Sequence, residues 1–218
     1  MDEYMNEQEQ WEFVRNWLRQ NGVWLVAGVA LAAVGLWGWR SWQAHVETML
    51  MEANAQYQQV LVAFGKNDLA TATKLADQLV ATHPHTGYAE QAQLNVARML
   101  VENNQLPSAL DRLQKVQSST SDPELKLVIR LRIARIQIEQ NRPDDALKTL
   151  SAVDPGAFAG RFAEVRGDAL LAKGDRAGAL KAYREAQSAQ SAQSAQSSQG
   201  GANAGDLLAL KINELTRS

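Results

Sequence analysis

The most constraining feature of this sequence is an uncharged and mostly apolar run over residues 20–39. An α-helix rises about 1.5 Å per residue, so about 20 residues cross the roughly 30 Å hydrocarbon core of a bilayer. Arg19 and Arg40 close the two ends. Tryptophan prefers the membrane interface, because its ring is apolar while its N–H seeks water, and five tryptophans lie near the two ends of this run: Trp17, Trp24, Trp37, Trp39 and Trp42. The run therefore predicts a transmembrane helix over residues 20–42 rather than a buried helix of a soluble core.

The flanking charges bear on how this helix is used. The segment before the run is net acidic, and no small-residue cleavage site follows the run, so we expect an uncleaved signal anchor. Arg15 and Arg19 precede the span, whereas only Arg40 closely follows it. Lys and Arg are enriched on the cytoplasmic side. The count therefore favours a cytoplasmic arm over residues 1–19 and places residues 43–218 across the membrane.

Two helical faces in this region are candidates for contacts. Gly28, Ala32 and Gly35 fall on one side of the predicted span, and small residues let another membrane helix approach closely. Glycine and alanine are also common in membrane helices, which is the alternative reading. A second face, on the arm, carries Trp11, Val14 and Leu18. We expect that face to lie on the membrane surface, and the alternative is that it binds a partner.

The rest of the chain contains a degenerate repeat. Aligned segments place alanines at Ala72, Ala109, Ala146 and Ala179, with spacings of 37, 37 and 33 residues. The tetratricopeptide repeat has a period of about 34 residues, with an alanine on its second helix. That repeat also needs a small residue on its first helix, where the two helices cross. Twelve positions before the alanines, the sequence has Val60, Ala97, Ala134 and Gly167. The predicted fold class is therefore all-α: one transmembrane helix followed by a helical-repeat solenoid.

The helical periodicity and its stop signals predict where the helices lie. Asp122 stands at an N-cap position before Pro123, and Gly65 and Gly174 are expected to end helices. Residues 187–205 form a Ser/Ala/Gln tandem repeat without charge, and we expect a flexible loop or a fraying helix end there. The last helix should cap the solenoid. The predicted helices are 2–19, 20–64, 68–82, 86–103, 107–117, 123–140, 143–151, 158–173, 176–188 and 206–216.

The sequence lacks a recognisable catalytic constellation. There is no cysteine, no P-loop and no nucleophile motif, and the formal net charge is −2. His83 and His85 flank Pro84 in a predicted turn, where we expect solvated side chains rather than a metal site. We therefore expect no enzymatic activity, no cofactor, no metal, no small-molecule substrate and no nucleic-acid partner.

Binding remains as the expected role, because stacked helix pairs present a concave surface to peptides or partner domains. Aligned to the repeat, six first-helix residues should face this concavity, and they form the candidate groove: Leu94, Arg98, Glu102, Leu131, Arg135 and Ile138. The alternative for the leucines and the isoleucine is a place in the core.

Several segments, in their order behind the predicted anchor, resemble a known family. They include Asn21-Gly22, Gly38-Trp39-Arg40, the Leu131–Arg135 segment LRIAR, the RGDALLAKGD segment over residues 166–175 and the LKINEL segment over residues 210–215. With them the chain resembles the YfgM-type family, the ancillary subunits of the SecYEG translocon. The Ser/Ala/Gln insertion before the last helix departs from the family's pattern.

The resemblance implies a bacterial inner-membrane protein with its repeat domain in the periplasm, without catalytic residues. It implies partners in SecYEG and in a PpiD-type periplasmic chaperone, and a role in handing translocated polypeptides to periplasmic chaperones. Two alternatives stay open. One is a tethered repeat scaffold in another envelope-assembly process, and the other is a regulator that acts on a signalling protein through the cytoplasmic arm.

Overall fold

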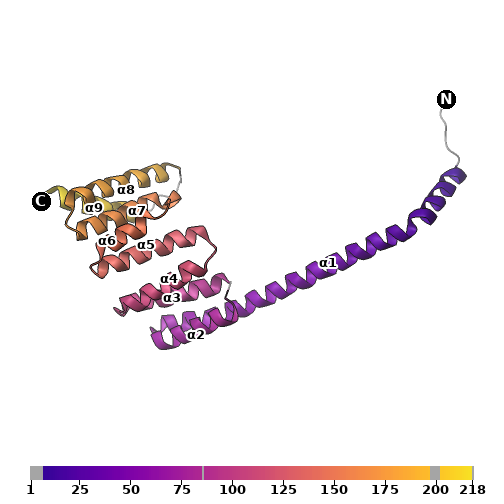
Figure 1. The fold of residues 1–218 in the computed structure, drawn as a ribbon, viewed down its shortest axis with the longest axis horizontal. Helices are drawn as coiled ribbons and strands as arrows, with labels where there is room; N and C mark the ends of the chain where they lie inside the picture. Colours follow the sequence, from indigo (N-terminus) through magenta and orange to yellow (C-terminus); the bar gives the residue numbers. More distant parts are fainter. Residues whose placement is uncertain (1–6, 85, 197–201, 218) are drawn as a thin grey trace, which may run out of the picture. The chain divides into compact units, whose positions relative to one another are not determined.

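A computed structural model describes residues 7–84, 86–196 and 202–217, and these residues are mostly helical (Figure 1). Within them there is no β-strand, so the predicted all-α class is confirmed. The helices are α1 (Glu7–Gly65), α2 (Leu69–Thr82), α3 (Gly87–Glu102), α4 (Leu106–Ser119), α5 (Pro123–Glu139), α6 (Pro143–Ser151), the 3-10 turn η1 (Gly156–Phe158), α7 (Ala159–Ala172), α8 (Arg176–Gln196) and α9 (Ala202–Arg217).

The chain divides into two units, Met1–Glu52 and Ala53–Ser218. In the first unit, the described residues belong to α1, which joins the two helices predicted over residues 2–19 and 20–64; residues 2–6 lie outside the described residues. The Asn21-Gly22 pair does not break the helix, because a single glycine costs only about 1 kcal/mol there. Asn21 also bonds back into the helix, since its Nδ2 donates to the carbonyl oxygen of Trp17 at 3.1 Å.

The second unit is a stack of helix pairs with the same turn inside each pair. Asn67, Asn104, Asn141 and Gly174 each have a positive φ, between 54° and 89°. These four residues lie five positions before the repeat alanines. Asparagine and glycine tolerate the left-handed region better than other residues, and such a residue after a helix closes a Schellman motif. The paired bonds of that motif recur, as in Asn104 N to Val101 O at 2.9 Å and Gln105 N to Leu100 O at 2.8 Å.

The repeat positions read from the sequence form the contacts between paired helices. The four repeat alanines are completely buried. Val60, Ala97, Ala134 and Gly167 are buried as well, each on the first helix of its pair. Where both side chains are small, the two helices can cross closely, and larger apolar residues such as Leu79, Leu113 and Tyr183 are buried in the surrounding core. The repeat prediction is confirmed.

Local capping explains where several helices begin. The carboxylate of Asp122 accepts hydrogen bonds from Glu124 N at 2.8 Å and Leu125 N at 3.1 Å, which confirms the predicted N-cap of α5. Asp68 does the same for α2 through Thr71 N at 3.0 Å. His83 differs from its expected place in solvent. It is 7 % exposed, because its N–H closes α2 onto Leu79 O at 2.8 Å and the turn folds it inward. His85 lies outside the described residues.

The Ser/Ala/Gln segment is more helical than expected. The loop predicted over residues 187–205 is helical at both ends, since α8 continues to Gln196 and α9 begins at Ala202. Alanine and glutamine are good helix formers, so α8 can run on without an apolar face to bury. Residues 197–201 lie outside the described residues. The predicted cap is confirmed: Leu208 is completely buried, and Ile212 and Leu215 pack against the same cluster of α7 and α8 residues.

Candidate interaction surfaces

The predicted membrane span presents its surface to the outside within the first unit. By length and composition, α1 is the one helix in the described part of the chain that can cross a membrane, and its most apolar window has no buried residue. Gly28, Ala32 and Gly35 are all exposed. A Cβ atom placed on either glycine meets nothing within 4 Å, so this face is open to a neighbouring helix. Its packing role stays a prediction.

The arm is open as well. Trp11, Val14 and Leu18 are 74 %, 44 % and 49 % exposed on one side of α1. An apolar helical face of this kind suits either a membrane surface or a partner helix.

The six residues of the candidate groove come from α3 and α5. Leu94 and Leu131 are 4 % exposed and belong to the apolar core, while Ile138 is half-buried against it. Arg98, Glu102 and Arg135 are exposed. The leucines therefore form the floor under this surface, and the charged side chains are its accessible part. The binding role of the six residues stays a prediction.

Charge at corresponding repeat positions differs along the stack. Arg98, Arg135 and Asp168 each lie eleven residues before a repeat alanine. Leu94, Leu131 and Glu164 each lie fifteen residues before it. The same two positions are therefore occupied by arginine and leucine in α3 and α5, but by two carboxylates in α7.

Both carboxylates of α7 are paired with one lysine of the same chain. Lys211 Nζ of α9 lies 2.8 Å from Asp168 Oδ1 and 3.1 Å from Glu164 Oε1. Tyr183, which is buried, donates its hydroxyl hydrogen bond to Asp168 at 2.8 Å. Burial alone would lower the pKa of Lys211, but the two carboxylates outweigh it and raise the pKa. This cluster fixes α9 on the last repeat.

Among the described residues, no ion pair joins Arg98 of α3 or Arg132 and Arg135 of α5 to another helix. Arg98 pairs with Glu102 at 2.8 Å and lies 5.6 Å from the centroid of the Phe64 ring. Arg132 and Arg135 have neither an ion-pair nor a hydrogen-bond partner among the described residues. Burial lowers the pKa of Arg132, and the charges of Arg135 and Arg98 lower it further. We call Arg98, Arg132 and Arg135 the arginine face.

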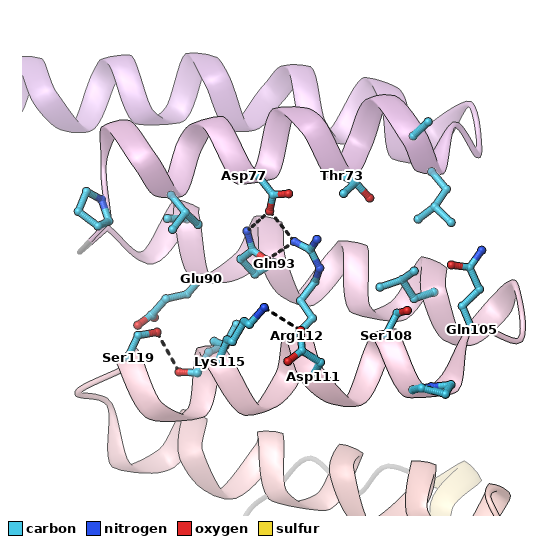
Figure 2. A pocket seen from close by; sticks show the side chains of 18 residues that line it. Thr73, Asp77, Glu90, Gln93, Gln105, Ser108, Asp111, Arg112, Lys115 and Ser119 are labelled. Carbon is cyan, nitrogen blue, oxygen red and sulfur yellow. Dashed lines mark hydrogen bonds and ion pairs between the residues drawn. The ribbon is translucent and has the colours of Figure 1, made fainter.

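A cavity of about 1180 Å³ lies elsewhere, between α2, α3 and α4 (Figure 2). Figure 2 shows Asp77, Gln93 and Arg112 meeting in it, each from a different helix. Arg112 Nη1 donates to Asp77 Oδ1 at 2.8 Å and also to Gln93 Oε1, while Gln93 Nε2 donates to Asp77 at 3.1 Å. The guanidinium of Arg112 is mostly buried, with 16 % of the side chain exposed.

The polar groups of this cavity mainly satisfy one another. Burial opposes ionisation of Asp77, but hydrogen bonds from Arg112 and Gln93 outweigh it and hold the pKa of this carboxyl below its ordinary value. At the rim, Lys115 pairs with Asp111 at 2.7 Å. The cluster therefore fastens three helices together and leaves little unpaired charge for a ligand.

Neither Arg132 nor the Asp77–Gln93–Arg112 cluster was expected from the sequence as part of a site. Arg132 lies three residues before Arg135 within the LRIAR segment, so helical spacing alone places both on one side of α5. No local sequence pattern predicts the cavity cluster, because its members come from three different helices.

Comparison with known proteins agrees with this architecture. A protein-family model described as a tetratricopeptide repeat-like domain matches residues 15–217. The solved structure of the MamA RS-1 ArsTM double mutant superposes with a TM-score of 0.52 at 13 % identity, covering 76 % of this chain and 94 % of that one, which is a likeness of fold alone.

Curated relatives carry one name, ancillary SecYEG translocon subunit. The Escherichia coli (strain K12) protein is 38 % identical over 84 % of this chain and 88 % of its own length. The Aggregatibacter actinomycetemcomitans protein is 31 % identical over 97 % and 98 %, and the Neisseria gonorrhoeae protein 26 % identical over 85 % and 90 %. With a tetratricopeptide-like stack behind an apolar N-terminal helix, and with identity of this extent, the chain belongs to the YfgM-type family of ancillary SecYEG translocon subunits.

Proposed function

We propose that this protein is a non-enzymatic, membrane-anchored adaptor at the SecYEG translocon. The observation that carries the proposal is the 38 % identity to the Escherichia coli ancillary SecYEG translocon subunit over 84 % of this chain. The repeat fold supports it, since stacked helix pairs serve as protein-binding scaffolds. In this role the protein helps pass translocated polypeptides to periplasmic chaperones, including one of the PpiD type.

The proposed topology divides the chain at the membrane. Residues 1–19 form a cytoplasmic arm, residues 20–42 span the inner membrane once, and residues 43–218 lie in the periplasm. Supporting this orientation, Arg15 and Arg19 precede the span, whereas Arg40 alone closely follows it. The exposed apolar face of the arm then rests on the inner surface of the membrane.

The proposal assigns separate roles to two surfaces. The Gly28, Ala32 and Gly35 face packs against a transmembrane helix of the translocon, which requires an unobstructed helix surface, and this surface is open. The candidate groove on α3 and α5 contacts polypeptides or chaperones on the periplasmic side. Its exposed residues Arg98, Glu102 and Arg135 make these contacts, above the floor formed by Leu94 and Leu131.

Photo-crosslinking in living cells tests both roles. A photoreactive amino acid at Gly28 should capture a translocon subunit. The same probe at Ala30, which points to nearly the opposite side of the helix, should capture mainly lipid. For the groove, Arg135 is a better position than the buried Leu131, and we expect it to capture a periplasmic chaperone or a translocating chain.

A third probe at Trp11 reports the surroundings of the arm, where we expect lipid. If neither Gly28 nor Arg135 captures a translocon subunit, a translocating chain or a periplasmic chaperone, the adaptor proposal is wrong. Capture of a cytoplasmic signalling protein from Trp11, without those products, would support the regulator alternative instead.

A further inference from the structure

The arginine face carries two positive charges that no ion pair among the described residues uses. Arg132 and Arg135 are exposed and lie three residues apart on α5, and both are without a partner among the described residues. Arg98 on α3 adds a third positive charge, and Glu102 balances the charge of Arg98. Like charges held near one another repel, so this arrangement disfavours the free protein.

In the last repeat, the corresponding first-helix positions carry charges that are paired within the chain. In α7 the corresponding residues are Glu164 and Asp168, and Lys211 of α9 bonds to both. That place is closed by a cation from α9. Helices α3 and α5 share a core cluster, but there α5 contributes Arg132 and Arg135, and no ion pair joins either arginine to a carboxylate among the described residues.

Two other arginines of the repeat domain are paired within the chain. The cavity between α2, α3 and α4 holds an arginine, but Asp77 and Gln93 already satisfy it. Arg166 of α7 is paired with Glu185 of α8. Lys181 and Arg184 of α8 are likewise exposed and without an ion pair among the described residues, so Arg132 and Arg135 are distinguished by their place at the candidate groove.

Apolar surface accompanies the arginines. Val101, Ile138 and Leu171 each lie eight residues before a repeat alanine, three positions after Arg98, Arg135 and Asp168. Val101 and Leu171 are 38 % and 40 % exposed, and Ile138 is half-buried. A ligand for this surface needs carboxylates for the arginines and apolar side chains for the adjoining row.

We propose that the arginine face binds an acidic peptide segment of a partner polypeptide, with glutamate or aspartate side chains on the arginines and neighbouring apolar side chains on Val101 and Ile138. Guanidinium groups suit this ligand, because their planar donors match a carboxylate in a two-point hydrogen bond. The inference specifies the chemistry of the groove partner and so rests on the groove role proposed above.

Fluorescence anisotropy on the full-length protein in phosphatidylcholine nanodiscs tests the inference. The probe is a labelled peptide that alternates glutamate with leucine and alanine, and the matched peptide has glutamine for glutamate. We expect the glutamate peptide to bind at least about tenfold more tightly than the glutamine peptide, and its affinity to fall as salt is raised.

Matched variants locate the site. The Arg132→Gln/Arg135→Gln double variant should weaken binding of the glutamate peptide about tenfold or more, whereas Arg184→Gln, at an exposed arginine of α8, should leave it unchanged. The charge-reversed variant Arg132→Glu/Arg135→Glu should lose the glutamate peptide and gain a lysine peptide of the same pattern. That gain would also show that the reversed protein is folded.

Three outcomes overturn the inference. The first is equal binding of the glutamate and glutamine peptides. The second is equal weakening by the double variant and by Arg184→Gln. The third is arginine-dependent binding to phosphatidylglycerol vesicles without binding of the glutamate peptide, which would make the ligand a lipid surface. The assay contains no translocon, so its failure leaves the crosslinking result at Gly28 unaffected.

Discussion

At the scale of single residues, the repeat depends on where side chains are small. Gly167 occupies the helix-crossing position of the last pair, and the ring of the buried Tyr183 lies directly over it. In the earlier pairs, Val60, Ala97 and Ala134 take this position. Glycine is therefore needed at this position, because the Tyr183 ring of α8 fills the volume that a side chain at residue 167 of α7 would occupy.

We predict that Gly167→Ala destabilises the repeat domain. A Cβ atom at this position would lie 2.4 Å from Tyr183 Cε1, so the ring or the helix must shift, at a cost of about 1–3 kcal/mol. Urea unfolding followed by far-UV circular dichroism measures the effect. Gly160→Ala is the control on the same helix, because its new Cβ meets Ala189 at an ordinary 3.4 Å and gains helix propensity. Equal stability of the two variants would contradict this account of Gly167.

A second prediction concerns acid stability. The pKa of Asp77 is held below its ordinary value of 3.8, so ionised Asp77 stabilises the folded protein fully above that pH, and the contribution is lost as the pH falls through the folded-state pKa. Asp77→Asn should therefore lower stability at neutral pH and make it less dependent on pH below about 4. Unfolding free energies measured across this range check the slope. Arg112→Gln removes the same interaction and should flatten the slope similarly; an unchanged slope in Asp77→Asn would refute the assignment.

At the scale of elements, α9 completes the stack without being a repeat. It buries Leu208 on the apolar face of the last pair and anchors it with Lys211 on Glu164 and Asp168. The opposite side of α9 keeps Leu207 and Leu210 exposed, at 61 % and 64 %. A solenoid needs such a cap, because its terminal pair would otherwise expose apolar surface.

We predict that the cap depends on one side chain more than on its neighbour. Leu208→Ala should cost about 2–5 kcal/mol, since the residue is completely buried, whereas Leu207→Ala should change stability by less than about 0.5 kcal/mol. Hydrogen exchange resolved to peptides should show faster exchange in α8 and α9 for Leu208→Ala. Matching exchange in the two variants would mean that α9 does not cap the stack.

At the scale of the whole molecule, the chain combines a helix that can cross a membrane with a unit that has its own core. The proposed function needs the second unit on the periplasmic side of the membrane. We predict that a reporter active only in the periplasm is active when it is fused after Ser218. The same reporter placed before Met1 should be inactive. An inactive C-terminal fusion on an intact chain would reverse the proposed orientation.

Much of the fold could be predicted from local sequence patterns. The repeat alanines, the N-cap at Asp122 and the turns at Asn104 and Asn141 involve contacts within one helix pair, where neighbours in space are near in sequence. The extent of α8 was not predictable in this way. Its Ser/Ala/Gln tail lacks an apolar stripe, so hydrophobic periodicity gave no prediction there. The helix continues because alanine and glutamine have high helix propensity.

The sequence by itself determined the apolar anchor segment, the paired helices, their period and the residues at which paired helices cross. Only the tertiary structure decided which charges meet. It joined Arg112 to Asp77 and Lys211 to Glu164 and Asp168, and it left Arg132 without an ion pair among the described residues. The reason is physical: helix pairing follows from local spacing, but the contact between side chains of successive pairs depends on how each pair is rotated on the one before it. That rotation is set by the packing of the whole interface, which no local pattern records.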